Sequence, residues 1–400
     1  MRLALLLISL VLASFALPER AHAVSPAPDG NYPNGNTAEG QNALFSLTTG
    51  GYNTAAGWFS LKSLSTGSFN TGVGAGTLVL STADFNTALG AAALLLNTIG
   101  TRNTALGTTA LLYNNTGSFD TAIGDRALFN NTTGDHNTAV GTAGLGGGPA
   151  LFNNTIGRFN TAVGGAALAS NTEGNDNTAI GVGALANNID GDENVAVGLN
   201  ALNNSTGNNN VAFGNYAGFG ATTGSNNVYI GYQIEGTAGE SNACYIGSIF
   251  NQTSMGGSPV YVDANSKLGT LTSSKRFKEN IEPMDRASDA LFALKPVMFR
   301  YKKEIDPAGK SQLGLVAEEV EKVNPDLVVR DKEGKPYSVR YDQVNAMLLN
   351  EFLKEHRTVQ DQGATIARLE KQIEALTAGL EKVSAQIETS KPVPQVVNNP

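Results

Sequence analysis

The sequence predicts a mainly β protein. We expect a repetitive β-solenoid of about 17 residues per coil, then a small α+β domain and a C-terminal coiled coil, with the whole chain trimeric. Three observations lead to this fold class. A five-residue phrase recurs at a nearly constant spacing, glycine is concentrated before Ser273, and apolar residues near the C-terminus follow a heptad pattern. A fixed short period is typical of proteins built from stacked repeats.

The recurring phrase is Asn-Thr-Ala-x-Gly, with small variations at each position. Its copies follow one another at 16 or 17 residues, except for one step of 23 that absorbs an insertion around 144–149. The copies begin at Asn36, Asn53, Asn70, Asn86, Asn103, Asp120, Asn137, Asn160, Asn177, Asn194, Asn210 and Asn227. So regular a spacing predicts that every copy folds in the same way.

Each unit is predicted to hold one short strand between turns, because Thr-Ala-Ile and Thr-Ala-Val alternate while Gly and Asn tolerate left-handed corners. A unit this short cannot bury its own apolar face, so we expect successive units to stack at about 4.8 Å. Ala, Val, Ile and Leu are expected to point inward, with Asn and Thr at corners and solvent-facing positions. Such a thin core favours several chains packed side by side.

After the repeats, 248–272 is predicted to form a neck with one strand at Pro259–Asp263. The alternation and spacing of apolar residues then predict a compact α+β domain. Its expected elements are a short helix at Ala287–Leu294, strands at Pro296–Tyr301 and Gln312–Val316, a helix at Glu318–Val323, and a hairpin of Leu327–Arg330 with Tyr337–Tyr341.

A long helix with heptad spacing is predicted to close the chain. One core position is taken by Val359, Ile366, Ile373, Leu380 and Ile387, and the other by Gln362, Leu369, Leu376 and Val383. Sustained spacing of this kind indicates a coiled coil, and these residue types suit a dimer as well as a trimer. The predicted organisation is 1–23 signal peptide, 24–247 solenoid, 248–272 neck, 273–355 α+β domain, 356–390 coiled coil and 391–400 disordered tail.

Charge and cysteine content exclude several classes of function. Residues 24–272 carry 5 basic and 14 acidic side chains, and 273–400 carry 20 of each. Neither half has the basic excess that phosphate neutralisation requires, so we expect no nucleic-acid partner. Cys244 is the single cysteine and the three histidines are scattered, so we expect no disulfide, no metal and no cofactor.

The N-terminus has the pattern of a secretory signal. Arg2 precedes an apolar run over 3–17, and Ala21-His22-Ala23 fits the rule for cleavage between small residues. We therefore expect an exported chain that starts near Val24 and is secreted or held at the cell surface, with an uncleaved membrane anchor as the alternative. No later segment has the length and apolar character of a membrane-spanning helix, so we expect none in the mature chain.

In composition and in the regular spacing of their motif, the repeats resemble the head repeats of trimeric autotransporter adhesins, which stack short Ala-Ile/Val-Gly phrases into a β-roll. We expect a homotrimer, because the core of a single rod is thin, and its Thr and Asn ladders could bind a cell-surface or glycan ligand. A plain spacer is the simplest alternative. An ice-binding or glycan-binding rod is another, and it would require a flat, regular array of threonines on one face.

A candidate site for self-cleavage lies where the repetitive sequence gives way to charged sequence. Ser273 stands five residues before Lys278, and such a pair can supply both nucleophile and base. Lysine acts as a base only when its pKa falls toward neutrality, which burial and the neighbouring cations Lys275 and Arg276 would promote. The alternative is a turn serine beside a solvated lysine.

An ordered series of motifs resembles the peptidase S74 family, the intramolecular chaperones of endosialidase-type tail spikes. The resemblance covers about 273–388. It is carried by Ser273-x-x-Arg276-Phe277-Lys278-x-Asn280-Ile281, Leu294-x-Pro296-Val297-x-Phe299-x-Tyr301, Gly314-Leu315-Val316-Ala317-x-Glu319-Val320, Pro325-x-Leu327-Val328 and Tyr337-x-Val339-x-Tyr341. The family has Asp where Ser274 stands and Gln where Glu318 stands.

The resemblance implies a trimeric chaperone that folds the preceding β-rich segment and then cleaves itself off. Ser273 matches the family nucleophile and Lys278 the base, so the bond cut would be Thr272–Ser273. The remaining motif residues that would support the site are Arg276, Asn280, Gly314, Glu318 and Glu319. The alternative is an uncleaved domain that serves as a permanent trimerisation clamp. No activity on external substrates is expected.

Overall fold

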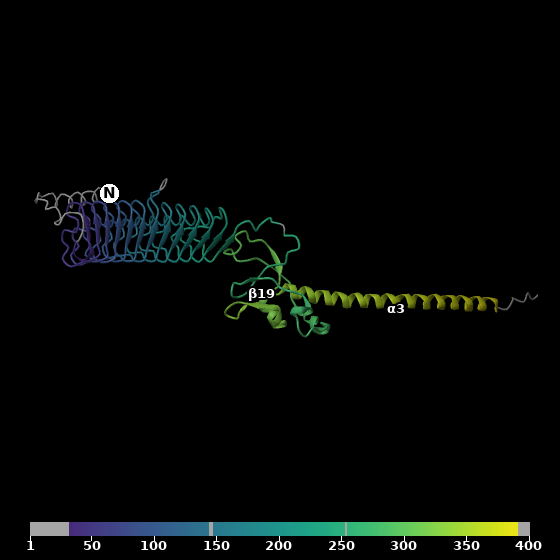
Figure 1. The fold of residues 1–400 in the computed structure, drawn as a ribbon. Helices are drawn as coiled ribbons and strands as arrows, with labels where there is room; N and C mark the ends of the chain where they lie inside the picture. Colours follow the sequence, from purple (N-terminus) through teal and green to yellow (C-terminus); the bar gives the residue numbers. More distant parts are fainter. Residues whose placement is uncertain (1–31, 144–146, 253, 391–400) are drawn as a thin grey trace, which may run out of the picture. The chain divides into compact units, whose positions relative to one another are not determined.

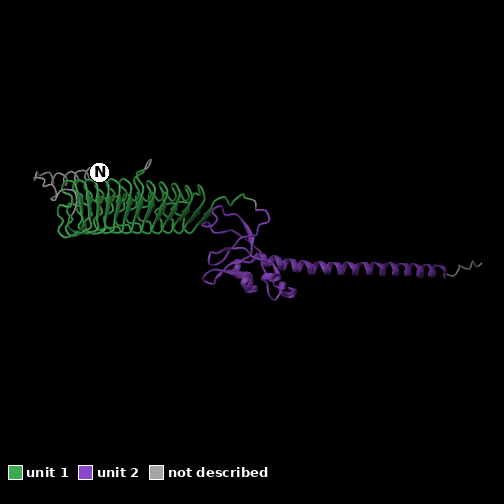
Figure 2. Cartoon of the chain, in the orientation of Figure 1, with its two compact units in different colours: residues 1–253 green, residues 254–400 purple. Residues whose placement is uncertain are grey.

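The structure is a computed structural model that describes residues 32–143, 147–252 and 254–390. The predicted signal peptide, part of the insertion around 144–149 and the C-terminal tail lie outside these residues. The chain divides into two compact units, which Figure 2 colours separately as 1–253 and 254–400. Within the described residues, no helix combines the length and the apolar character needed to cross a bilayer.

The first unit is a β-solenoid, as the repeats predict. A short 3₁₀ turn, η1 (Pro33–Gly35), precedes a parallel sheet of 13 strands in which each strand pairs with the next in the chain (Figure 1). The strands are β1 (Thr37–Glu39), β2 (Thr54–Ala56), β3 (Thr71–Val73), β4 (Thr87–Leu89), β5 (Thr104–Leu106), β6 (Thr121–Ile123), β7 (Thr138–Val140), β8 (Thr161–Val163), β9 (Thr178–Ile180), β10 (Val195–Val197), β11 (Val211–Phe213), β12 (Val228–Ile230) and β13 (Cys244–Ile246). Most coils span 16 or 17 residues, and the coil with the insertion spans 23.

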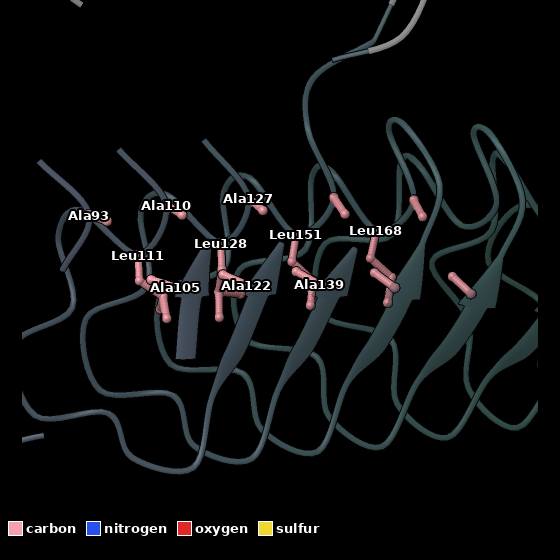
Figure 3. Packing of buried hydrophobic residues seen from close by; sticks show 14 of the residues in the cluster. Ala93, Ala105, Ala110, Leu111, Ala122, Ala127, Leu128, Ala139, Leu151 and Leu168 are labelled. Carbon is pink, nitrogen blue, oxygen red and sulfur yellow. The ribbon is translucent and has the colours of Figure 1, made fainter. Parts of the chain in front are cut away.

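Small side chains fill the interior of the coils. The central residue of each strand, which is Ala in most of them, points inward, and Ala and Leu of the following corner complete the core, as Ala105, Ala110 and Leu111 do in one coil (Figure 3). The prediction that the strand Val and Ile residues point inward is wrong. Because side chains alternate along a strand, an inward central Ala places the residues on both sides of it on the outer face.

Asparagine is also part of the core, so its prediction as a solvent-facing residue is wrong for the Asn that opens each unit. Asn70 is fully buried. Its side-chain Oδ1 accepts a hydrogen bond from the backbone N–H of Asn86 at 2.9 Å, and its Nδ2 donates to the carbonyl of Ala83 at 2.8 Å. Repeated from coil to coil, these bonds satisfy backbone groups that the strands leave unpaired. We call this column, which begins at Asn36 and ends at Asn227, the first amide ladder.

A second amide ladder runs beside the first, with which it shares carbonyl acceptors such as that of Gly191, and its members hydrogen-bond to one another. Asn171 Nδ2 donates to Asn154 Oδ1 at 2.9 Å and to the Gly174 carbonyl at 3.0 Å. Its members are Asn97, Asn114, Asn131, Asn154, Asn171 and Asn188. The sequence pattern did not distinguish these residues from ordinary turn asparagines.

Left-handed corners let the chain turn within so few residues. Gly57, directly after β2, has φ of 134°, and a Cβ there would lie 2.5 Å from the Gly74 carbonyl oxygen. Glycine is therefore required both for its conformation and for the close approach of neighbouring coils. Buried leucines such as Leu111 adopt a φ of 52° at the next corner, and burial of their side chains offsets that strain.

The second unit holds the predicted α+β domain. Its elements are β14 (Tyr261–Val262), β15 (Leu268–Gly269), η2 (Lys275–Phe277), η3 (Asp285–Ala293), β16 (Val297–Phe299), β17 (Gln312–Gly314), α2 (Ala317–Val323), η4 (Pro325–Leu327), β18 (Val328–Arg330), β19 (Pro336–Val339) and α3 (Tyr341–Thr389). Strand pairs β14–β15, β16–β17 and β18–β19 are antiparallel. The predicted hairpin is therefore present, with Gly334 at φ of 81° in its turn.

Two features of this unit differ from the sequence-based expectation. The predicted neck strand has a partner, β15, that the pattern did not indicate. The segment predicted as a helix at Ala287–Leu294 is a 3₁₀ helix, η3, which runs from Asp285 to Ala293. A 3₁₀ helix repeats every three residues, so a periodic apolar pattern over so short a segment does not separate the two helix types.

Candidate self-cleavage site

The predicted cleavage site lies in an extended segment that leads into the short turn η2. Thr272 and Ser273 precede the turn, and Lys278 follows it directly as its C-terminal cap. Two backbone hydrogen bonds close the turn, from Phe277 N–H to the Ser274 carbonyl at 3.0 Å and from Lys278 N–H to the Lys275 carbonyl at 3.1 Å. The local fold therefore places the predicted nucleophile and the predicted base on either side of one turn.

The side chains of this turn are exposed in the single chain, including Ser273 and Lys278. The Arg276 guanidinium lies over the Phe277 ring, 4.6 Å from its centroid, and the ring itself remains exposed. A lysine becomes a general base when its ammonium is removed from water. The described residues of the C-terminal unit leave Lys278 open to solvent, so its burial requires a surface beyond this unit.

Two of the supporting motif residues have clear backbone roles. Asn280 adopts a φ of 52°, a left-handed conformation that asparagine tolerates well. Gly314 ends β17, and a Cβ there would lie 2.9 Å from the Tyr341 hydroxyl oxygen. That hydroxyl accepts a hydrogen bond from the Leu315 N–H at 2.9 Å. Glycine at 314 thus lets the start of α3 dock against the end of β17.

The two acidic motif residues, Glu318 and Glu319, lie in the first turn of α2, where negative charge favours the helix. Glu319 accepts a hydrogen bond from Lys322 at 2.6 Å, and this bond holds the pKa of the carboxyl below its ordinary value. Within the described residues, no hydrogen bond or ion pair joins Ser273 or Lys278 to either glutamate. The structure therefore gives these acids a helix-stabilising position and no contact with the dyad.

Sequence reasoning missed a polar cluster that joins η3 to α3. Ser288 is fully buried, and its hydroxyl oxygen accepts hydrogen bonds from Asn350 Nδ2 at 2.6 Å and from Lys354 Nζ at 3.3 Å. The same hydroxyl donates to the Glu351 carboxylate, which also binds Lys354 at 2.6 Å. The bond to Glu351 raises the pKa of Lys354, and the bond to Lys354 lowers that of Glu351.

This cluster stabilises the fold and is not suited to catalysis. Ser288 has no access to solvent, and the hydrogen bond to Glu351 keeps Lys354 in its charged form, so this pair lacks the neutral amine of a serine–lysine catalyst. Asp289, which accepts from Lys354 at 3.3 Å and from Arg286 at 3.1 Å, extends the network. A sequence signal was scarcely available, because the partners lie about 60 residues apart in the chain.

The apolar core of the C-terminal unit is small for the length of chain that it supports. Its buried members are Val320, Leu327, Val328, Val339, Val344 and Met347. A cavity of about 220 Å³ lies beside this core, between the end of η3 and α2, with Leu294, Glu319 and Val323 among its lining residues. Large apolar side chains remain on the surface, including Phe292 at 75 % exposure and Leu313 at 80 %. The unit therefore presents more apolar surface than is usual for a stable isolated domain.

Comparison with known proteins gives one match. No curated protein and no solved structure matches the chain. The family model for peptidase S74, described as the chaperone of endosialidase, matches 273–329, which begins at the predicted nucleophile and ends within β18. The resemblance stated from the motifs is therefore confirmed over this segment: residues 273–329 are similar to the peptidase S74 family, the chaperone of endosialidase.

Proposed function

We propose that this chain is an exported fibre protein that assembles as a homotrimer, and that its C-terminal domain drives folding of the β-solenoid and then releases itself at Thr272–Ser273. The observation that carries the proposal is the position of the family match, whose first residue is Ser273. The match thus begins where a cleaved product would begin, beyond the last strand of the solenoid and after β15.

Exposed apolar residues on α3 support assembly. The heptad residues of this helix are open to solvent in the single chain, with Ile373 at 62 % and Leu380 at 70 % exposure. An apolar stripe along a helix of 49 residues is the surface that a partner helix covers in a coiled coil. Partner chains that pack on α3 and on the neighbouring apolar surface would also bring new side chains close to η2.

The need for a chaperone follows from the solenoid. A parallel sheet of 13 strands forms by stacking coils in sequence, and each unfinished edge can pair with another chain. Joining three chains at one end raises their local concentration and sets a common register. The domain would then be needed during folding and could be removed afterwards.

The proposed cleavage uses only groups of the chain and water. Ser273 Oγ attacks the Thr272 carbonyl carbon while Lys278 Nζ takes the hydroxyl proton. The C–N bond then breaks, the amine nitrogen of Ser273 receives the proton from Lys278, and an ester joins Thr272 to Ser273 Oγ. Water hydrolyses the ester to a Thr272 carboxylate and a free Ser273 hydroxyl. Lys278 must be neutral at the first step, which links cleavage to its burial on assembly.

The test is the intact mass of the purified full-length product, with N-terminal sequencing and denaturing electrophoresis. We expect fragments that begin near Val24 and at Ser273, and an uncleaved chain for Ser273→Ala. Lys278→Arg keeps the positive charge but removes the base, so it should also stay uncleaved. A wild-type chain that remains full length after assembly would overturn self-cleavage and favour the permanent clamp.

A further inference from the structure

The outer face of the solenoid sheet consists of two columns of side chains. In each strand the first and third residues point outward, because the central residue is in the core. The first column is Thr37, Thr54, Thr71, Thr87, Thr104, Thr121, Thr138, Thr161, Thr178, Val195, Val211, Val228 and Cys244. The second is Glu39, Ala56, Val73, Leu89, Leu106, Ile123, Val140, Val163, Ile180, Val197, Phe213, Ile230 and Ile246. We call these the threonine column and the aliphatic column.

Both columns are continuous because the strands are parallel and in register. Thr104 pairs with Thr121 and Leu106 with Ile123, and the same correspondence continues from β1 to β13. Each residue therefore has an equivalent residue one strand spacing away, at about 4.8 Å. The two columns form a continuous strip along the whole sheet.

The strip is almost free of charge and rich in apolar side chains. Glu39, in the first strand, is its one charged residue. In the aliphatic column, Leu106 is 41 % exposed, Ile180 41 % and Phe213 46 %. The solvated face of a sheet normally carries polar residues, whereas parallel sheets are normally covered on both faces. An apolar strip of this length indicates a surface that is covered in the assembled protein.

We infer that the sheet face is covered by further copies of the same chain, which pack against it side by side, aliphatic column toward aliphatic column. This inference rests on the proposed trimer and adds where its solenoids meet. A parallel copy has the same coil spacing, so its columns match this strip from end to end without loss of register. Few other partners would share that period over 13 strands.

The available area is sufficient for such packing. Thirteen strands at about 4.8 Å extend for about 60 Å, and three residues across give a width of about 10 Å. The planar area is then on the order of 600 Å² for each chain, before side-chain relief is added. Specific interfaces bury about 600–1,000 Å² per partner, so a contact along this strip lies at the lower end of that range.

The course of the two columns distinguishes this occupant from ice or a glycan. Thr occupies the first column only as far as Thr178, after which Val and Cys take its place. The aliphatic column continues to Ile246 in the last strand. A surface selected for hydroxyl groups would keep its threonines throughout, whereas packing of apolar side chains requires only that the aliphatic column continue.

Cysteine cross-linking of the assembled full-length protein tests the inference. In a Cys244→Ser background, Leu106→Cys places a thiol on the strip, and Thr133→Cys places one at an exposed corner outside the sheet. With a short bismaleimide, we expect most Leu106→Cys chains to become covalent dimers and at least tenfold fewer of the Thr133→Cys chains. Ile180→Cys should cross-link like Leu106→Cys. It provides the same test at a second position of the strip if Leu106→Cys folds poorly.

The outcomes separate this inference from the proposed function. Sedimentation first establishes whether the chains form a trimer. A trimer with no preference for cross-linking at 106 and 180 overturns the inference and leaves the trimer intact, whereas monomeric chains overturn both. If the trimer slows ice recrystallisation and Thr104→Val abolishes this activity, the sheet face is free and the inference is wrong.

Discussion

The backbone N–H of Asn137 donates a hydrogen bond to the Asp120 carboxylate at 2.8 Å, where Asp120 stands in the first amide ladder in place of asparagine. The other carboxylate oxygen accepts from Asn131 Nδ2 at 3.2 Å. Asp120 is fully buried, and this burial raises its pKa to about 8. The first amide ladder thus contains one carboxyl group whose pKa lies near neutral pH.

This position should make the solenoid sensitive to pH. A carboxyl whose pKa is raised on folding stabilises the fold fully below its unfolded pKa, and that stabilisation is lost as pH rises toward about 8. We expect the apparent melting temperature of the full-length protein to fall between about pH 4 and pH 8. Asp120→Asn should remove most of this slope and add on the order of a few kcal/mol at pH 8.

The control for this prediction is Asn103→Asp, which places a second acid in the preceding coil of the ladder. Thermal unfolding followed by circular dichroism at a fixed scan rate should show a steeper fall in stability with pH. If Asp120→Asn leaves the pH profile unchanged, Asp120 is not the group that sets it.

The corner glycines should not accept even one methyl group. Gly90 has φ of 128°, and a Cβ there would lie 2.5 Å from the Gly107 carbonyl oxygen. We expect Gly90→Ala to destabilise the solenoid by about 2 kcal/mol or more, since strain and a clash act together. Gly363→Ala is the matched control. In α3 a Cβ at 363 would meet nothing within 4 Å, so that variant should gain about 0.5–1 kcal/mol.

A stack of rings along one corner of the solenoid should contribute to its stability. Phe119 and His136 stack at 4.7 Å, and His136 and Phe159 at 4.9 Å. On the other side of Phe119, the Arg102 guanidinium lies 5.3 Å from its ring centroid and 5.1 Å from that of Phe85. The planar guanidinium of Arg102 thus stacks between the Phe85 and Phe119 rings and continues the column of rings.

We expect Arg102→Phe to keep the stability of the solenoid within about 0.5 kcal/mol, since a ring restores the stack. Arg102→Ala removes the stacked guanidinium, and we expect the free energy of unfolding of the solenoid to fall by about 1 kcal/mol, as measured by thermal unfolding. Equal losses for Phe and Ala at this position would mean that the guanidinium charge matters and the stacking does not.

The buried Ser288 cluster should hold η3 to the beginning of α3. Ser288→Ala leaves Asn350 and Lys354 without their shared acceptor, and we expect the C-terminal unit to lose about 1–3 kcal/mol. Thr358→Ala removes only a hydrogen bond from an exposed hydroxyl to the Lys354 carbonyl, so it should have little effect. Hydrogen exchange at 285–293 reports the result, and unchanged protection in Ser288→Ala would exclude the proposed tether.

Particular residues separate what the repeat pattern could predict from what it could not. The spacing from Asn53 to Asn70 sufficed to predict stacked coils, because every coil must turn through the same corners in the same number of residues. It could not assign asparagine to the core. A buried Asn is satisfied only when the neighbouring coil brings a backbone N–H within reach, as the 2.9 Å bond from Asn70 N–H to Asn53 Oδ1 does.

The candidate site divides in the same way. Ser273 and Lys278 could be selected from sequence because their spacing and the motifs around them are local. Ser288 could not, because its partners Asn350 and Lys354 lie about 60 residues further along the chain. Nor could periodicity alone tell which alternating residues of Thr104–Leu106 face inward, since both faces of this strand carry small or apolar side chains.

By itself, then, the sequence determined the solenoid, its coil length and the hairpin of the C-terminal unit, and it selected the candidate serine–lysine pair. Only the tertiary structure decided that asparagine lines the core, that the strand Val, Leu and Ile residues face outward, and that a buried serine joins η3 to α3. The physical reason is that period and turn chemistry are local properties of a chain. Burial and hydrogen-bond satisfaction depend on which distant segment becomes the neighbour.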